Sequence, residues 1–175
     1  MAAIFETFGP FELARRGGLD SESLEDFWGQ EGVPSGLRDE CGIYIVCTRH
    51  GSSPLKPWYV GKTEGRFEKR FNSHLKSRKF DEIAKNSPNG PLQIFLIARR
   101  TPKNRPVRYA RRNTKAVKEI EFALIGACLP LNRDLLNIKE VDFFRKMHVP
   151  GFYVSKRRTS SAAAGELKLM LGSKS

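Results

Sequence analysis

The run Gly42–Thr48 (GIYIVCT) decides the fold of this chain, together with the shorter run Trp58–Gly61 (WYVG). Both runs are rich in β-branched and aromatic residues, and residues 51–57 between them supply Gly, Ser and Pro. This pattern predicts two antiparallel strands joined by a loop longer than the usual few residues. The first strand is apolar on both faces, so we expect it to lie in the middle of a sheet.

Hydrophobic spacing predicts the elements that follow. Residues 64–85 repeat apolar side chains at helical intervals, with a kink expected at 77–79. Residues 92–98 are the best third strand. Residues 114–128 have the spacing of an amphipathic helix, which Pro130 follows and stops.

The first forty residues form an acidic arm with three basic and nine acidic side chains. Residues 4–18 are expected to form a short helix or an extended lead-in, and Asp20 or Ser21 then caps a short helix. The apolar side chains of that helix are Leu24, Phe27 and Trp28. We favour a surface helix held by its aromatic residues. The alternative is that the arm folds over the basic body as a mask or a dimer strap.

The net charge of +12 comes from residues 41–175, which carry twenty-eight basic and ten acidic side chains. Residues 99–118 alone hold nine basic residues and no acidic one. A basic body favours a polyanion, most simply nucleic acid, because each Lys or Arg on a phosphate releases counterions. An acidic membrane surface is the rival, but we find no lipidation motif and no basic amphipathic helix with an aromatic face. The predicted nucleic-acid contacts are Lys62, Arg66, Arg99, Arg100, Lys103, Arg105, Arg108, Arg111 and Arg112.

No apolar run is long enough to span a membrane, and the N-terminus lacks the pattern of a secretory signal. We therefore expect a cytoplasmic protein. The three cysteines, Cys41, Cys47 and Cys128, fit neither a disulfide framework nor a common zinc pattern.

Several side chains suit the hydrolysis of a phosphodiester, which needs an activated water, a cation for the developing charge and a proton for the leaving oxygen. Arg70 supplies a planar fork that matches phosphate, and His74 lies one helical turn further on the same face. Glu121 falls beside the apolar face of its helix, where a carboxylate is costly without a partner or a metal. Tyr44 and Tyr59 bring hydroxyl groups to the two strands.

These motifs resemble those of the GIY-YIG nuclease superfamily. Gly42-Ile43-Tyr44 followed by Tyr59-Val60-Gly61 resembles its paired signature, and Phe67–Arg70 with His74 resembles the Arg-bearing helix of its homing endonucleases. Glu121 before Leu124-Ile125 resembles the Glu helix of the family, and Pro130–Asn132 resembles its closing Pro-x-Asn. The resemblance covers roughly residues 41–133. Two departures are a longer loop at 52–57 and an enlarged basic stretch before the Glu helix.

The resemblance implies an α/β (α+β) fold with a three-stranded antiparallel sheet flanked by helices, and one Mg²⁺ or Mn²⁺ held by a single carboxylate. Its implied roles are as follows: Tyr44 activates water, Tyr59 binds the scissile phosphate or orients the nucleophile, Arg70 stabilises the pentacovalent phosphate, His74 shuttles a proton or contacts the phosphate, Glu121 ligates the metal and Asn132 holds the site together. The expected parts are the acidic arm (1–40), the nuclease-like domain (41–133), a helical extension packing on it (134–155) and a basic tail (156–175).

Each of these residues also has an ordinary interpretation. Tyr44 and Tyr59 fit as strand aromatics, and His74 fits as a surface or core histidine. Glu119 is a neighbouring candidate for the metal ligand, but Glu121 lies closer to the apolar face and matches the family spacing.

Three functions therefore compete. The first is a metal-dependent DNA endonuclease, which would use a dimer or sequential nicking to cut both strands. The second is a catalytically silent nucleic-acid-binding module of the same fold. The third, a basic structural protein of a ribonucleoprotein, explains the charge but not the two tyrosines with Arg70 and Glu121.

Overall fold

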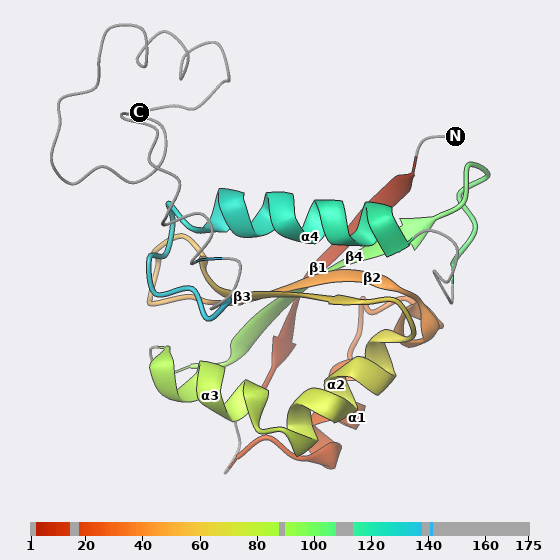
Figure 1. Ribbon diagram of the computed structural model, residues 1–175. Helices are drawn as coiled ribbons and strands as arrows, with labels where there is room; N and C mark the ends of the chain where they lie inside the picture. The colour runs from red at the N-terminus through yellow and green to blue at the C-terminus, as the bar shows by residue number, and fades with distance from the viewer. Residues whose placement is uncertain (1–2, 15–17, 88–89, 108–113, 138–140, 142–175) are drawn as a thin grey trace, which may run out of the picture.

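The computed structural model describes residues 3–14, 18–87, 90–107, 114–137 and 141. Within these ranges an antiparallel sheet of four strands lies between α4 on one face and α1, α2 and α3 on the other (Figure 1). In chain order the elements are β1 (Ile4–Leu13), α1 (Ser21–Gly29), the 3-10 helix η1 (Leu37–Asp39), β2 (Gly42–Thr48), β3 (Lys56–Thr63), α2 (Phe67–Lys76), α3 (Lys79–Asn86), β4 (Leu92–Arg100) and α4 (Thr114–Cys128). The strand order is β1-β4-β2-β3, so β2 is central as predicted and β3 lies at an edge.

Most of the predicted elements are confirmed. The strand at 42–48 and the helix at 114–128 have the predicted bounds. The helix expected over 64–85 is present as α2 and α3, and the expected kink is a complete break, because Arg78 between them has a left-handed backbone with φ 54°.

The prediction of three strands is wrong, because residues 4–13 form a fourth strand. This strand, β1, pairs with β4 over its whole length, from Ile4 opposite Arg100 to Leu13 opposite Leu92. The register shifts between Phe8 and Phe11, where Gly9-Pro10 interrupts the pairing. The interruption removes the regular alternation by which a strand is recognised in a sequence. Proline is tolerated here because β1 is an edge strand.

The predicted helix of the acidic arm is confirmed as α1. The Oδ1 atom of Asp20 accepts the backbone N–H of Ser23 at 2.8 Å, which caps the helix. The buried rings of Phe27 and Trp28 pack on Phe71 of α2, with centroids 5.6 and 5.3 Å away. The aromatic residues thus hold α1 to the body.

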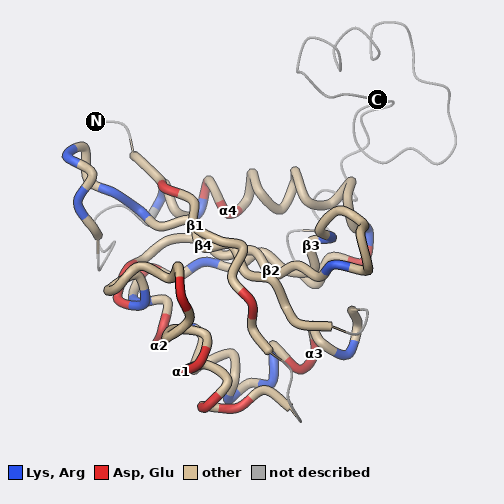
Figure 2. Tube along the Cα trace, turned by 180° about the vertical axis from the view of Figure 1, so that it is seen from behind, with Lys and Arg blue, Asp and Glu red and all other residues tan. Residues whose placement is uncertain are grey.

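The acidic residues of α1 lie away from the described part of the basic loop that follows β4 (Figure 2). Other carboxylates of the arm do pair with predicted nucleic-acid contacts on the body: Glu6 and Glu40 with Arg100, and Asp39 with Arg66.

The two faces of the sheet carry separate cores. Tyr44 and Leu96 face α1, α2 and α3, whereas Ile43 and Val60 face α4. No helix in the described part of the chain is both long and apolar enough to cross a bilayer. The predicted helical extension at 134–155 lies mostly outside the described residues, and the tail at 156–175 lies wholly outside them.

Candidate active site

Tyr44 and Gly61 lie directly opposite each other on β2 and β3. The buried ring of Tyr44 crosses Gly61 so closely that a Cβ there would stand 2.8 Å from Cε2, and nearer still to Cζ and the hydroxyl. A Cβ on Gly42 would likewise collide with the carbonyl oxygen of Ile97 on β4. Close approach therefore requires glycine at both positions.

The regular pairing of β2 with β3 places Tyr59 on the same face as Tyr44, and a β-bulge adds Trp58 to that face. Val46 pairs with Tyr59 and Cys47 with Pro57, so Trp58 is an extra residue on β3. As a result Trp58 and Tyr59 both join the core on the α2 side of the sheet. The ring centroids of Tyr44 and Tyr59 are 6.1 Å apart. The structure thus brings together the two tyrosines that the sequence singled out.

Helix α2 adds Arg70 and His74 to the tyrosines. The Nε2 atom of His74 contacts the hydroxyl of Tyr44 in a short hydrogen bond, and Nε of Arg70 donates to the same hydroxyl at 3.4 Å. The ring of His74 also packs against Tyr59, with centroids 5.7 Å apart. Phe67 and Phe71 are fully buried, which fixes the rotation of α2 and aims Arg70 and His74 at β2.

Burial sets the protonation states of this cluster. It lowers the pKa of His74 to about 3, with the charges of Arg70 and Lys79 adding to the effect, so the imidazole is neutral. A neutral His74 can accept the proton of the Tyr44 hydroxyl at Nε2. Burial also raises the pKa of Tyr44 well above its ordinary value, and the charge of Arg70 offsets only part of this rise. Tyr44 therefore rests protonated, with its proton directed at His74.

Tyr59 links this cluster to α4 on the other face of the sheet. Burial raises the pKa of Tyr59, the positive charge of Arg70 lowers it, and the negative charge of Glu121 raises it further. Both charges therefore act on one hydroxyl. Lys79 of α3 adds a cation over the Tyr59 ring, with Nζ 5.0 Å from the centroid.

Glu121 reaches this region from α4 and pairs with Lys62 of β3. Its side chain is 13% exposed, whereas that of Glu119 is 63% exposed. The more buried carboxylate is the one that the sequence favoured. Lys62 pairs with Ile43, which faces α4, so Lys62 and Glu121 lie on the α4 side of the sheet, whereas Tyr59 lies on the α2 side. Among the described residues no hydrogen bond or ion pair joins Glu121 to Tyr44, Arg70 or His74.

The donor set suits a weakly held hard cation. Among the described residues no three His, Cys, Asp or Glu side chains gather to form a closed metal cage. Mg²⁺ binds through one or two carboxylates and keeps several of its waters. One carboxylate, such as that of Glu121, is therefore enough as the protein ligand of a Mg²⁺ ion. The Lys62 ammonium already occupies a cation position beside that carboxylate. Glu121 would therefore hold a divalent ion only after Lys62 had moved away from its carboxylate.

Asn132 is buried and ties the chain after α4 to β3. Its Nδ2 donates to the carbonyl of Pro57 at 2.8 Å, and its Oδ1 accepts the N–H of Asp134 at 3.0 Å. It makes no recorded contact with Arg70 or Glu121 within the described part of the chain, so it acts as a structural support.

Asn137 is a functional residue that the sequence did not reveal. Its Oδ1 accepts the N–H of Val60 at 2.9 Å and its Nδ2 donates to the carbonyl of Val60 at 2.6 Å. The N–H of Leu136 donates to the carbonyl of Trp58 at 2.9 Å. These bonds hold the edge strand on both sides of Tyr59. No signal in the sequence could have found it, because its partner Val60 is distant in the chain and its burial is seen only in the structure.

The residues predicted to contact nucleic acid differ in their burial and in their ion pairs. Arg100 is buried and forms ion pairs with Glu6 and Glu40, so its charge is used inside the fold. Lys62 is paired with Glu121. Arg66 pairs with Asp39 at 3.3 Å, and Arg99 is half-buried on β4. Lys103 and Arg105 are exposed in the loop after β4, and Arg108, Arg111 and Arg112 lie outside the described residues.

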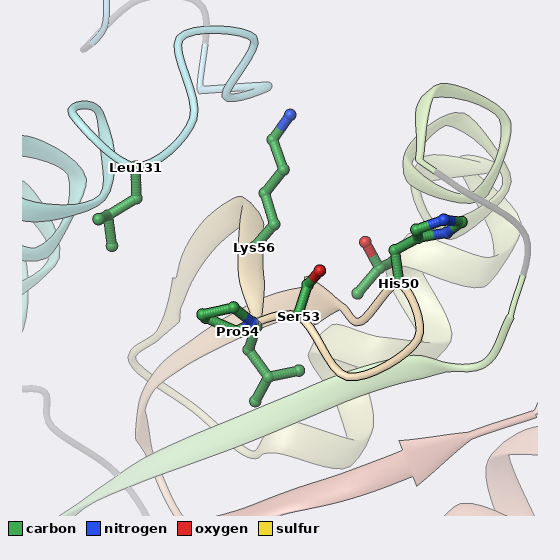
Figure 3. A pocket seen from close by; sticks show the side chains of 7 residues that line it. His50, Ser53, Pro54, Lys56 and Leu131 are labelled. Carbon is green, nitrogen blue, oxygen red and sulfur yellow. The ribbon is translucent and has the colours of Figure 1, made fainter.

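A hollow of about 360 Å³ lies apart from this site, between the β2–β3 loop and the turn after α4 (Figure 3). His50 and Leu131 lie on opposite sides of Lys56 there. Neither the clustered residues Tyr44, Tyr59, Arg70 and His74 nor Glu121 line it.

Comparison of the chain with known protein families, with characterised proteins and with solved structures finds no match.

Proposed function

We propose that this chain is a metal-dependent endonuclease of the GIY-YIG type, which hydrolyses phosphodiester bonds of DNA with a single active site. The observation that carries the proposal is the cluster at the β3 edge, where Arg70 and His74 both contact the hydroxyl of Tyr44. Tyr59 lies within the same cluster, and the negative charge of Glu121 raises its pKa.

Each residue of the cluster would have a separate role in phosphodiester hydrolysis. Arg70 would donate hydrogen bonds to non-bridging oxygens of the scissile phosphate and stabilise the charge that develops there. Tyr44, whose proton is directed at Nε2 of His74, would accept a hydrogen bond from the attacking water and orient it, and solvent would take the proton of that water. The new P–O bond forms as the bond to the leaving oxygen breaks, and solvent supplies the proton for that oxygen. Tyr59 would orient the phosphate by a hydrogen bond from its hydroxyl.

Glu121 would hold the divalent ion that the GIY-YIG resemblance implies, after release of Lys62. When bound, such an ion supplies positive charge to phosphate oxygens and lowers the pKa of its waters. Asn132 and Asn137 would keep β3 in place beneath the reacting groups.

One observation favours the alternative, a silent nucleic-acid-binding module of the same fold. The pairing of Lys62 with Glu121 neutralises the single carboxylate and occupies the position that a metal would take. Under this alternative DNA binds but is not cut.

The two functions separate in a cleavage assay on supercoiled plasmid with Mg²⁺ or Mn²⁺. The nuclease proposal expects nicked or linear product from the wild type, and loss of product in Arg70→Ala and Glu121→Ala while both variants still bind DNA. Binding without cleavage on duplex, branched and single-stranded substrates would establish the silent module instead.

A further inference from the structure

The outer face of α2 carries four exposed polar side chains in one stripe: Lys69, Asn72, Ser73 and Lys76. Their spacing of i, i+3, i+4 and i+7 places them on one side of the helix. Together with Glu68 they line a shallow hollow of about 440 Å³. None of the four belongs to the cluster around Tyr44, and the sequence assigned no role to them. We call these four residues the α2 outer face.

The charge of this face is positive, although Glu68 lines the hollow. The carboxylate of Glu68 is held by Nη2 of Arg38 at 2.6 Å, and Nη1 of Arg38 bonds Glu25 at 3.4 Å. In contrast, no ion pair is recorded for Lys69 or Lys76 among the described residues. Four other lysines, Lys62, Lys79, Lys115 and Lys118, have carboxylate partners. Lys56, Lys85 and Lys103 form no ion pair with a described residue, so the lack of a partner is not peculiar to this face. What distinguishes Lys69 and Lys76 is that both line one hollow, and two ammonium groups at one hollow suit an anionic ligand from outside the fold.

The chemistry of the four side chains suits a row of phosphates. Two ammonium groups, a hydroxyl and an amide all donate hydrogen bonds. Such side chains, rather than base-reading pairs, supply most contacts to nucleic-acid backbones. Lys69 and Lys76 are seven residues apart, or about 10 Å along the helix axis. This length corresponds to about three nucleotide steps of a duplex strand.

The position of the face relates it to the candidate active site. Lys69 and Ser73 immediately precede Arg70 and His74, so each pair is separated by about 100° around one helix. The buried Phe71 fixes that helix against the sheet. A strand that presents one phosphate to Arg70 would therefore continue over the α2 outer face.

We propose that the α2 outer face binds the phosphates that flank the scissile phosphate of a DNA strand. The proposal rests on the proposed nuclease function for the role of Arg70, but it concerns binding and is tested by binding. It also assigns part of the substrate contact to α2, since Arg100 of the predicted basic stretch is committed to Glu6 and Glu40.

The test compares two double variants with the same loss of charge. Lys69→Ala/Lys76→Ala changes the α2 outer face, and Arg49→Ala/Lys85→Ala removes two exposed basic residues from the β2–β3 loop and from α3. Affinity for a short DNA duplex is measured without metal over a series of NaCl concentrations. The first variant should bind about tenfold more weakly at low salt, with a log–log salt slope less steep by about two. The control should stay within about twofold of the wild type.

Equal behaviour of the two double variants would overturn the proposal. Its failure is distinguishable from failure of the nuclease function. If DNA binding by the wild type depends on Lys69 and Lys76 as predicted but the wild type never cuts DNA, phosphate binding by the α2 outer face is supported and the nuclease function is rejected. If the wild type cuts DNA while the two double variants bind DNA equally, the nuclease function is supported and phosphate binding by the α2 outer face is rejected.

Discussion

His74 contacts the hydroxyl of Tyr44 through Nε2, in a pocket where burial lowers the pKa of the imidazole to about 3. The ordinary pKa of histidine is about 6.5, so between these values the unfolded chain binds a proton that the folded chain rejects. The free energy of unfolding should therefore fall as the pH drops from about 6.5 towards 3, by about 1.4 kcal/mol for each pH unit at most. Above pH 6.5 this residue should contribute no slope.

Chemical denaturation of the wild type and His74→Gln at several pH values isolates this effect, because all other acids titrate in both proteins. The difference in stability between the two should shift in favour of the variant as the pH falls below about 6.5. A constant difference would mean that burial and the charges of Arg70 and Lys79 do not hold His74 neutral.

Gly61→Ala should displace the Tyr44 ring, because the new Cβ would overlap Cζ and the hydroxyl. We expect a loss of about 1–3 kcal/mol in the free energy of unfolding and a strong loss of cleavage. Gly65→Ala is the matched control, since its Cβ would meet nothing closer than the Thr63 hydroxyl at 4.0 Å. Thermal unfolding and nicking rates measure both effects. Equal stability of the two variants would contradict the observed packing.

Asn137→Ala should destabilise the fold by about 2–4 kcal/mol, because it leaves the buried N–H and C=O of Val60 without partners. Asn86→Ala removes a single bond to the carbonyl of Glu82 on an exposed helix end, and should cost less than about 0.5 kcal/mol. Urea unfolding of both variants gives the comparison. A loss for Asn137→Ala no larger than that for Asn86→Ala would show that β3 does not depend on this clamp.

Lys62→Met should strengthen binding of Mn²⁺, because it removes the ammonium that neutralises Glu121. The pair is partly exposed, so the gain should be roughly 1 kcal/mol, or about fivefold in affinity. Titration calorimetry without DNA measures it directly. Lys118→Met, whose partner Glu64 is 4.0 Å away, should leave the affinity unchanged. If Lys62→Met also leaves it unchanged, Glu121 is not the ligand.

The sequence revealed those parts of the fold that depend on local pattern. The strand at 42–48, the helix at 114–128 and the break before Lys79 follow from hydrophobic spacing and were predicted. β1 was not, because Gly9-Pro10 and a register shift disrupt its alternation, and its pairing with β4 joins residues about ninety positions apart.

The residues of the candidate site were likewise predicted only where a local motif identifies them. Tyr44, Tyr59, Arg70 and His74 were proposed from their motifs, and they form one cluster. The interior role of Arg100 and the clamp made by Asn137 depend on partners distant in sequence, Glu6 and Val60, which no local pattern identifies. Likewise, the ion pair between Glu68 and Arg38 beside the α2 outer face is visible only in three dimensions.

The most direct test of one shared active site is the single-turnover cleavage rate of Arg70→Ala, Glu121→Gln and the double variant, with Glu119→Gln as the control. If Arg70 and Glu121 act on the same phosphate, each single change should slow cleavage by about 10²-fold or more. The double variant should be little slower than the slower single variant. Glu119→Gln should cut like the wild type. Wild-type rates in Glu121→Gln, or multiplying losses in the double variant, would contradict a single site at the β3 edge.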